Sequence, residues 1–279
     1  MNQVKILSLI LGCCCLAGCF KQPDFEQVQI NLSPSAVSED VSDGSKPIEA
    51  EAVVESADNN QSQSAVIGSE DNPRSAVAAV PTELELAVAF APQAPFGRWD
   101  GLHQEACEEA SMIIVSRYFS GQSLNHSIME EEIQKLIAWE AAQDYRVDLT
   151  ATEAVAVLAD YFGLSARVEP EATIDRIKYE LSLGNLIIVP AAGRELGNPY
   201  FQTPGPIYHM LVIKGYNQRE FITNDVGTKR GDGFRYPYDR LIAAIHDWDH
   251  RLAEDGMTDE EIAQGARVLI VVEKPRIIL

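Results

Sequence analysis

The stretch that decides the fold is residues 104–111, with the sequence QEACEEAS. Residues 112–119 (MIIVSRYF) continue it as a largely apolar run, and Gly121 supplies a stop, which together predict a helix that begins near Cys107. Four of the five cysteines lie in the first twenty residues, so Cys107 is the only thiol in the rest of the chain. At the start of a helix, free amide N–H groups and the helix dipole stabilise a thiolate, which is the nucleophilic form.

Two interpretations of Cys107 stay open on this local pattern. Free cysteine is among the most buried residue types, so Cys107 could simply pack the start of a helix. Its acidic neighbours Glu105, Glu108 and Glu109 suit a helix N-terminus, but they also raise the pKa of a nearby thiol. A catalytic interpretation therefore needs a base elsewhere in the chain.

The N-terminal residues 1–18 have the pattern of a secretory signal peptide, with a short basic start and an apolar core too short to span a bilayer easily. Residues 16–19 (LAGC) resemble a lipobox, which implies cleavage before Cys19 and lipidation of that cysteine. Phe20 in place of an aspartate implies, by the lipoprotein sorting rule, an outer-membrane anchor facing the periplasm. An ordinary signal peptide, or an uncleaved anchor, is the alternative. We expect a protein of the cell envelope.

Residues 19–80 are predicted to form a disordered acidic tether behind the lipidated cysteine. From residue 20 to residue 80, acidic residues outnumber basic ones by 11 to 3, and the segment has too few apolar residues to build a core. The whole chain has a net charge of −20. Repulsion by that charge excludes nucleic acid as a partner.

The remainder, residues 81–279, is long enough for one globular domain with a real core. Helices are predicted over 107–119, 127–142, 150–162, 174–183 and 238–249, with a short one after Thr258; strands are predicted over 83–90, 166–168, 186–189, 208–216, 220–224 and 268–272. A long loop is predicted over 190–206 because of its prolines and glycines. Helices come first and strands last, which indicates an α+β fold with an antiparallel sheet.

The predicted hairpin of strands 208–216 and 220–224 supplies the base that Cys107 needs. Opposed residues of this hairpin have numbers that sum to about 434 to 436, which places His209 opposite residues 225–227. His209 and Asp225 then lie on neighbouring rungs of the ladder. A cysteine nucleophile needs such a base, and the base needs a carboxylate that orients it. The alternative is a histidine that caps the sheet and an aspartate that starts a turn.

Four segments together resemble the bacterial branch of peptidase family C39, which has a papain-like cysteine peptidase fold. They are residues 93–99 (QAPFGRW), 104–111, 208–216 (YHMLVIKGY) and 222–231, which begins ITND. The resemblance implies a catalytic site with Cys107 as nucleophile, His209 as general base and acid, and Asp225 as the orienting group. It implies Gln104, with Gln93 as the alternative, in the oxyanion hole. It implies no metal and no organic cofactor. Relatives often have Gly-Pro after the cysteine, where this chain has Glu108 and Glu109.

We therefore expect a membrane-anchored thiol hydrolase that cleaves an amide bond of a peptide-like substrate through an acyl-cysteine intermediate. An acyltransferase that uses the same cysteine is one alternative. A peptide-binding module that keeps the fold without catalysis is the other. His246 and His250 are four residues apart, which could suit a metal, but the pattern offers no third ligand and we expect an exposed polar helix face.

Overall fold

The computed structural model describes residues 79–253 and 256–276. The predicted signal peptide, the lipidated Cys19 and nearly all of the predicted tether lie outside the described residues, so these assignments remain predictions. Within the described part of the chain, no helix is both long enough and apolar enough to cross a membrane.

The described residues form eight helices and seven strands. The helices are α1 (Gly101–Gln104), α2 (Cys107–Ser120), α3 (His126–Ala142), α4 (Ala151–Asp160), α5 (Ile174–Ser182), α6 (Gly193–Leu196), α7 (Tyr238–Ala244) and α8 (Asp259–Ile262). The strands are β1 (Leu84–Glu85), β2 (Ala166–Glu169), β3 (Leu186–Ala192), β4 (Tyr208–Tyr216), β5 (Glu220–Asn224), β6 (Asp232–Pro237) and β7 (Leu269–Val272). The predicted α+β class, with early helices and a late antiparallel sheet, is confirmed.

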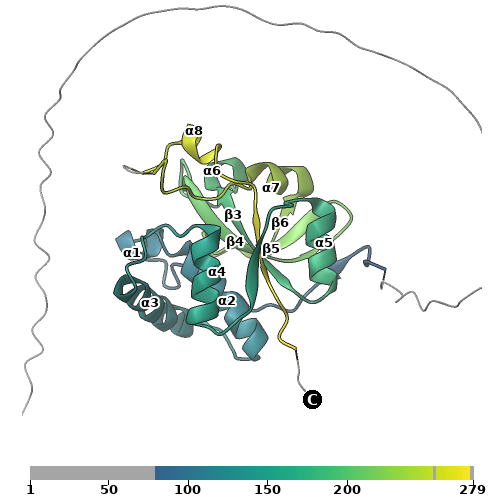
Figure 1. The fold of residues 1–279 in the computed structure, drawn as a ribbon, viewed down its shortest axis with the longest axis horizontal. Coiled ribbons are helices and arrows are strands. Elements are labelled where there is room, and N and C mark those ends of the chain that lie inside the picture. Colours follow the sequence, from purple (N-terminus) through teal and green to yellow (C-terminus); the bar gives the residue numbers. More distant parts are fainter. Residues whose placement is uncertain (1–78, 254–255, 277–279) are drawn as a thin grey trace, which may run out of the picture. The chain divides into compact units, whose positions relative to one another are not determined.

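All neighbouring strands pair antiparallel, in the order β2-β7-β3-β4-β5-β6, and β1 adds to β4. In Figure 1, α1 to α4 gather on the left of the strands and α5 lies on the right. Strand β4 is buried along its whole length, because β3 and β5 flank it and α2 packs against it. This strand carries His209, so the predicted base stands in the most enclosed part of the sheet.

Local sequence signals set the helix ends. Asn125 caps α3 by accepting the N–H of Ile128, and Thr150 forms a capping box with Glu153 at the start of α4. Gly121 ends α2 in the left-handed conformation, at φ 67°, where a residue with a Cβ would be strained. The first four predicted helices correspond to α2 to α5, and each of their ends is confirmed within two residues.

Four assignments made from the sequence need correction. The strand predicted over 83–90 is only two residues long, because the N–H of Val88 donates to the carbonyl of Leu86 in a tight turn that ends the pairing with β4. The predicted loop 190–206 begins later, because β3 continues to Ala192 in register with β4, and α6 follows it at once. Pairing with a neighbouring strand here overrides the local proline and glycine signals.

The helix predicted over 238–249 ends at Ala244. Ile245 becomes extended and bridges to Ala191, and the N–H of His246 donates to the carbonyl of Pro190. Strand β6 was not predicted, because its sequence, DGFRYP, contains a glycine, a proline and two charged residues. It adds to β5 and brings Tyr236 into the interior.

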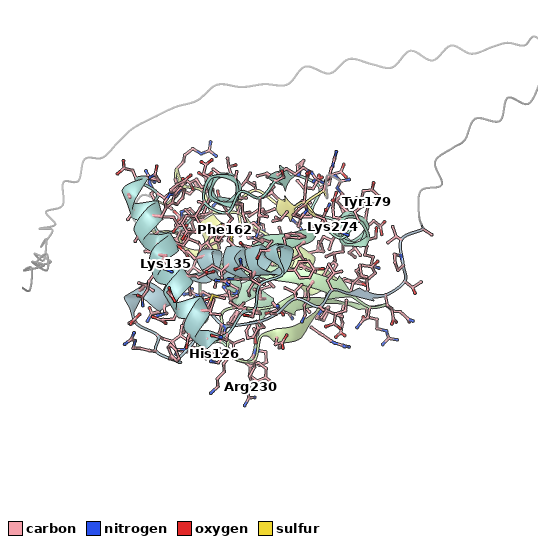
Figure 2. The ribbon with its side chains drawn as sticks, turned by 90° about the horizontal axis from the view of Figure 1, so that it is seen from below. His126, Lys135, Phe162, Tyr179, Arg230 and Lys274 are labelled. Atoms are coloured by element: carbon pink, nitrogen blue, oxygen red, sulfur yellow. The ribbon has the colours of Figure 1, made fainter. Side chains whose placement is uncertain are left out.

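Side chains from the sheet and from α2 to α5 fill one continuous apolar core. In Figure 2, Lys135 on α3 and Tyr179 on α5 lie on opposite sides of the molecule, and Arg230, from the loop between β5 and β6, projects from its lower edge. Burying apolar area contributes roughly 25 cal/mol per Å², so the core supplies most of the stabilisation. It also holds β4 and α2 at a fixed separation.

Candidate active site

Cys107 is the first residue of α2, as predicted from the sequence. Its side chain is buried, with 5% exposed, and its Sγ accepts a hydrogen bond from the backbone N–H of Met210 at 3.3 Å. Met210 directly follows His209 on β4, so the packing of α2 on β4 brings the thiol to the strand that carries the predicted base. An N–H donor and a helix N-terminus both favour a thiolate here.

The carboxyl group of Glu108 opposes these two influences. The thiol of Cys107 donates to Oε2 of Glu108 at 2.9 Å, and the other oxygen, Oε1, accepts the N–H of Leu149 at 3.3 Å. Burial raises the pKa of the Cys107 thiol well above its ordinary value, and the negative charge of Glu108 raises it further. Among the described residues, the hydrogen bonds of Sγ go to Glu108 and Met210, and none joins it to His209.

His209 and Asp225 are in contact, as the hairpin register predicts. Nε2 of His209 lies 2.9 Å from Oδ1 of Asp225, and the two side chains are 1% and 0% exposed. Because a charged Asp225 can only accept a hydrogen bond, Nε2 of His209 carries the proton and donates it, which leaves Nδ1 of the neutral ring as the free base. The ring of Phe201 packs edge-on against the imidazole, with centroids 5.3 Å apart. Both partners fix the orientation of the ring.

Asp225 has further donors that sequence reasoning missed. Oδ2 accepts hydrogen bonds from Asn198 at 2.9 Å and from the Tyr236 hydroxyl at 2.5 Å, and Oδ1 also accepts the N–H of Gly227 at 3.1 Å. Burial alone would raise the pKa of Asp225, but the charge and hydrogen bond of His209, together with the other donors, lower it. Asn198 follows α6 and Tyr236 belongs to β6, and no local signal connects either of them to Asp225.

A cavity of about 650 Å³ contains the predicted nucleophile and the predicted base in one wall. The loop 200–207 forms another wall, including Tyr200 and Phe201, and Trp99 and Trp248 supply further aromatic surface. Polar side chains such as Asp148 and Lys229 line it as well, and enzyme sites are commonly hollows where polar groups converge between aromatic side chains. The structure thus brings Cys107, His209 and, behind His209, Asp225 to a single cavity.

The two candidate glutamines differ in burial. Gln104 has an exposed side chain, whose Nε2 donates to the carbonyl of Trp99 at 3.0 Å. Gln93 is 3% exposed, and its Nε2 donates to the carbonyls of His103 and Gln104 at 2.9 and 3.1 Å. Both border the cavity. Oε1 of Gln93 is buried and has no hydrogen-bond partner among the described residues. Gln93 is therefore the rigidly held member of the pair.

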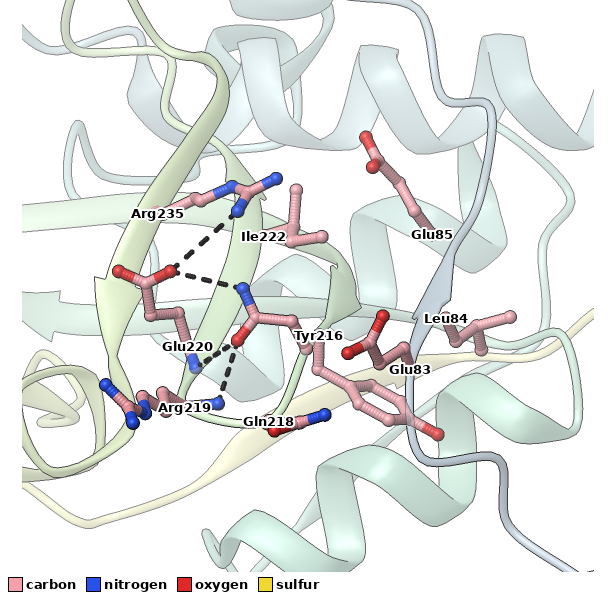
Figure 3. A pocket seen from close by; sticks show the side chains of 10 residues that line it. Glu83, Leu84, Glu85, Tyr216, Gln218, Arg219, Glu220, Ile222 and Arg235 are labelled. Atoms are coloured by element: carbon pink, nitrogen blue, oxygen red, sulfur yellow. Dashed lines mark hydrogen bonds and ion pairs between the residues drawn. The ribbon is translucent and has the colours of Figure 1, made fainter.

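A second hollow lies at the turn between β4 and β5 and shares no lining residue with the cavity of Cys107. Figure 3 shows that its polar groups bind one another: the side chain of Asn217 accepts the N–H groups of Arg219 and Glu220 and donates to the Glu220 carboxylate. Arg235 approaches the same carboxylate, at 3.9 Å. The polar residues of this hollow therefore stabilise the turn between β4 and β5.

His246 and His250 do not form the helix face that the sequence predicted, because α7 ends before both of them. Nδ1 of His246 lies 3.1 Å from the carbonyl of Gly265, and Nε2 of His250 lies 2.8 Å from the Glu153 carboxylate. Within residues 79–253 and 256–276, no group of three His, Cys, Asp or Glu side chains has the geometry of a metal site. The two histidines have separate structural partners.

Comparison with known proteins assigns the chain to a protein family. Residues 85–251, more than half of the chain, match the model of the Peptidase_C39 like family. This chain belongs to the Peptidase C39-like family, and membership indicates a cysteine peptidase-like function. A solved structure from Bacillus anthracis, described as a candidate C39-like peptidase, is similar at 13% identity, covering 69% of this chain and 98% of that one, with a TM-score of 0.44. No curated protein matches the chain.

Proposed function

We propose that this protein is a thiol hydrolase that cleaves an amide bond through an acyl-cysteine intermediate. The observation that carries the proposal is the buried contact between His209 and Asp225 at the cavity that also contains Cys107. A nucleophile, a base and an orienting carboxylate are the parts that amide cleavage by a thiol requires.

The proposed reaction has two steps. The proton of the Cys107 thiol passes to Nδ1 of His209, and the sulfur attacks the amide carbonyl and forms a C–S bond. His209 returns the proton to the nitrogen as the C–N bond breaks, and the amine leaves. Water then attacks the thioester, with His209 taking one of its protons, and the proton returns to the sulfur as the acid leaves. Asp225 stabilises the imidazolium in each step.

The oxyanion formed in each step needs hydrogen-bond donors close to the sulfur. The backbone N–H of Cys107 is one candidate, because the first N–H groups of a helix have no partner within it. We propose Gln93 as the second group in preference to Gln104, since Gln93 is buried and held in place beside the cavity. Both N–H groups of its Nε2 are donated to the carbonyls of His103 and Gln104, so one of these hydrogen bonds is exchanged for one to the oxyanion. Gln104, the choice made from the sequence, has an exposed side chain that binds Trp99.

We also propose that the protein is anchored in the cell envelope by lipidation of Cys19, in the outer membrane with the catalytic domain facing the periplasm. The motif LAGC at residues 16–19 and the apolar segment before it support this proposal. Metabolic labelling with an alkyne fatty acid is the test. The wild type should carry the label and the Cys19→Ala variant should not; equal labelling of both would contradict the anchor.

A thiol-directed peptide probe tests the hydrolase proposal. We expect covalent labelling of the intact protein at Cys107 and none in the Cys107→Ser variant. Analysis of peptide digests with and without an added amine then separates the two enzymatic outcomes. Free acid as the product in both cases identifies a hydrolase, whereas an amide formed with the added amine identifies an acyltransferase.

A peptide-binding module without catalysis is the second candidate, and one observation favours it. The thiol of Cys107 donates to Glu108, and burial holds the pKa of the thiol high, so the resting sulfur is a neutral thiol. In this case peptides should bind in the cavity, as measured by calorimetry, while neither the probe nor any peptide reacts. Reaction of the probe at Cys107 would exclude this candidate.

A further inference from the structure

We propose that Glu108 is a built-in restraint on Cys107, which holds the thiol in its neutral form until the hydrogen bond between the two side chains is broken. The inference rests on the proposed function, since it concerns the nucleophile of that reaction. It assigns a role to the residue that follows the cysteine, where the related peptidases that the sequence resembles often have glycine. Glu108 acts through Cys107 and is therefore a positioning residue.

The contact itself is the first argument. Sγ of Cys107 lies 2.9 Å from Oε2 of Glu108, and both side chains are buried, with 5% and 0% exposed. To form a thiolate here, the thiol must lose this hydrogen bond and place a negative charge next to a carboxylate. Two like charges this close repel strongly in a medium that excludes water.

The surroundings of Glu108 contain no compensating cation. On α2 its neighbours are Cys107 and Glu109; Asp148 faces it from the segment before α4, Glu140 from α3 and Tyr208 from β4. Among the described residues, Glu108 takes part in no ion pair, and its second oxygen is held by the N–H of Leu149. Burial and the charges of Glu109 and Asp148 raise the pKa of Glu108 well above its ordinary value, so its carboxyl group readily takes up a proton. Breaking the contact with Cys107 therefore requires that the Glu108 side chain move or take up that proton.

The other contacts of the sulfur favour the reactive form. The N–H of Met210 donates to Sγ at 3.3 Å, and Cys107 stands at the N-terminus of a helix of 14 residues. Without the Glu108 carboxylate, both contacts would stabilise a thiolate. Asp148, which is adjacent to Leu149, borders the cavity, so a bound substrate touches the segment that holds Glu108. Substrate binding could therefore move the segment at Leu149 and with it the Glu108 carboxylate.

The test is the alkylation rate of Cys107 by iodoacetamide in the full chain, measured from about pH 5 to about pH 10. Mass spectrometry of the peptide that contains Cys107 separates its reaction from that of the four N-terminal cysteines. For Glu108→Gln, we expect the midpoint of the curve of alkylation rate against pH to move to lower pH. The rate near neutral pH should rise roughly tenfold or more, since one pKa unit changes the thiolate fraction tenfold.

Glu109→Gln is the matched control, because Glu109 is the next residue, is also buried on α2, and pairs with Glu140 instead of the thiol. Its midpoint should move much less. An unchanged midpoint in Glu108→Gln would reduce Glu108 to a structural partner of Leu149 and overturn the proposal. Slower alkylation would also overturn it, by making Glu108 a proton acceptor that assists the thiol.

A measurement on the wild type covers the case in which Glu108→Gln does not fold. The ultraviolet absorbance of the thiolate, taken as wild type minus Cys107→Ser, should be absent near neutral pH and appear only in alkaline solution. A thiolate signal at neutral pH would overturn the restraint. Peptide hydrolysis is measured separately. Faster alkylation of Glu108→Gln without any peptide cleavage would support the restraint and reject the hydrolase. Peptide cleavage together with an unchanged alkylation rate in Glu108→Gln would support the hydrolase and reject the restraint.

Discussion

The sheet and the helices that adjoin the cavity hold buried carboxyl groups in opposite ionisation states. On the sheet side, Asp225 is fully buried and accepts hydrogen bonds from His209, Asn198, Tyr236 and the N–H of Gly227. These donors lower its pKa although burial opposes the charge. Asp225 is therefore ionised at neutral pH and can stabilise an imidazolium.

On the helix side, Glu109 and Glu140 are buried, and among the described residues neither has a cation to pair with. Burial and mutual repulsion raise the pKa of Glu109 to about 7 and that of Glu140 to about 10. At neutral pH the pair therefore keeps at least the proton of Glu140, which lowers the cost of burying the two carboxyl groups together. The contrast teaches that the number of donors, and not burial, decides the charge of a buried carboxyl group.

The largest expected effect comes from removing the carboxylate of the sheet side. Asp225→Ala removes the acceptor of four hydrogen bonds, so the free energy of unfolding should fall by about 3 kcal/mol or more. Asp225→Asn keeps the shape but loses the charge, and peptide cleavage should fall about a hundredfold or more because the imidazolium loses its partner. Urea unfolding and cleavage rates are the measurements. Full activity in Asp225→Asn would contradict the role of the charge.

The helix side should respond to pH in the opposite direction from the sheet side. The unfolded chain releases glutamate protons near the ordinary pKa, about 4.3, whereas the folded chain keeps those of Glu109 and Glu140. The unfolded state binds fewer protons above that pH, so stability falls as the pH rises, by on the order of 6 kcal/mol between about pH 5 and about pH 8. The low pKa of Asp225 instead stabilises the fold at neutral pH and loses its effect in acid.

Glu140→Gln sharpens this contrast. An amide in place of the acid donates to Glu109 and lowers its pKa, so the loss of stability between about pH 5 and about pH 8 should shrink to roughly half. Urea unfolding at several pH values is the measurement. Glu131→Gln, on an exposed turn of the same helix, is the control and should keep the wild-type slope. Identical slopes for Glu140→Gln and the wild type would mean that the acid pair does not form.

A smaller effect is expected from crowding the imidazole. A Cβ at Gly227 would lie 2.9 Å from Cε1 of His209 and 2.9 Å from the Phe201 ring. Gly227→Ala should therefore displace the imidazole and lower the cleavage rate roughly tenfold, with a change in stability of about 1 kcal/mol. Gly101→Ala is the control, since no atom lies within 4 Å of its added Cβ. Equal rates for both variants would show that the ring tolerates displacement.

The smallest expected effect separates the two glutamines. Gln93→Ala should lower the cleavage rate about tenfold, in the range of a weak oxyanion contact, whereas Gln104→Ala should change it less than about twofold. The physical reason is the burial and fixed position of Gln93. Steady-state kinetics of both variants on one peptide decides between them. A larger loss in Gln104→Ala would support the choice made from the sequence.

Local patterns predicted the parts of the site that depend on one element or on one hairpin. The helix that begins at Cys107 follows from an apolar run and a glycine stop, and the contact of His209 with Asp225 follows from the fixed spacing of a ladder. The paired residues Val212 and Asn224 have numbers that sum to 436, within the predicted range. The acidic residues after Cys107 were expected to raise the pKa of the thiol, and they do.

The remaining parts depend on contacts between distant segments. Asn198 and Tyr236 reach Asp225 from 27 and 11 residues away, through a loop and through a strand that has weak β propensity. The extension of β3 to Ala192 requires β4 as a partner. The burial of Gln93 likewise depends on the carbonyls of His103 and Gln104. No periodicity within one segment carries this information.

The entry of the chain into the domain has a mechanical consequence. Tyr216, at the end of β4, donates its hydroxyl to the carbonyl of Pro81 at 2.9 Å, and Leu84 and Glu85 pair with the same end of that strand. Tension applied to the chain before Pro81 is therefore transmitted first to β4, which also carries His209. Pulling on the protein from its N-terminal side would load the strand that holds the imidazole before any other part of the sheet.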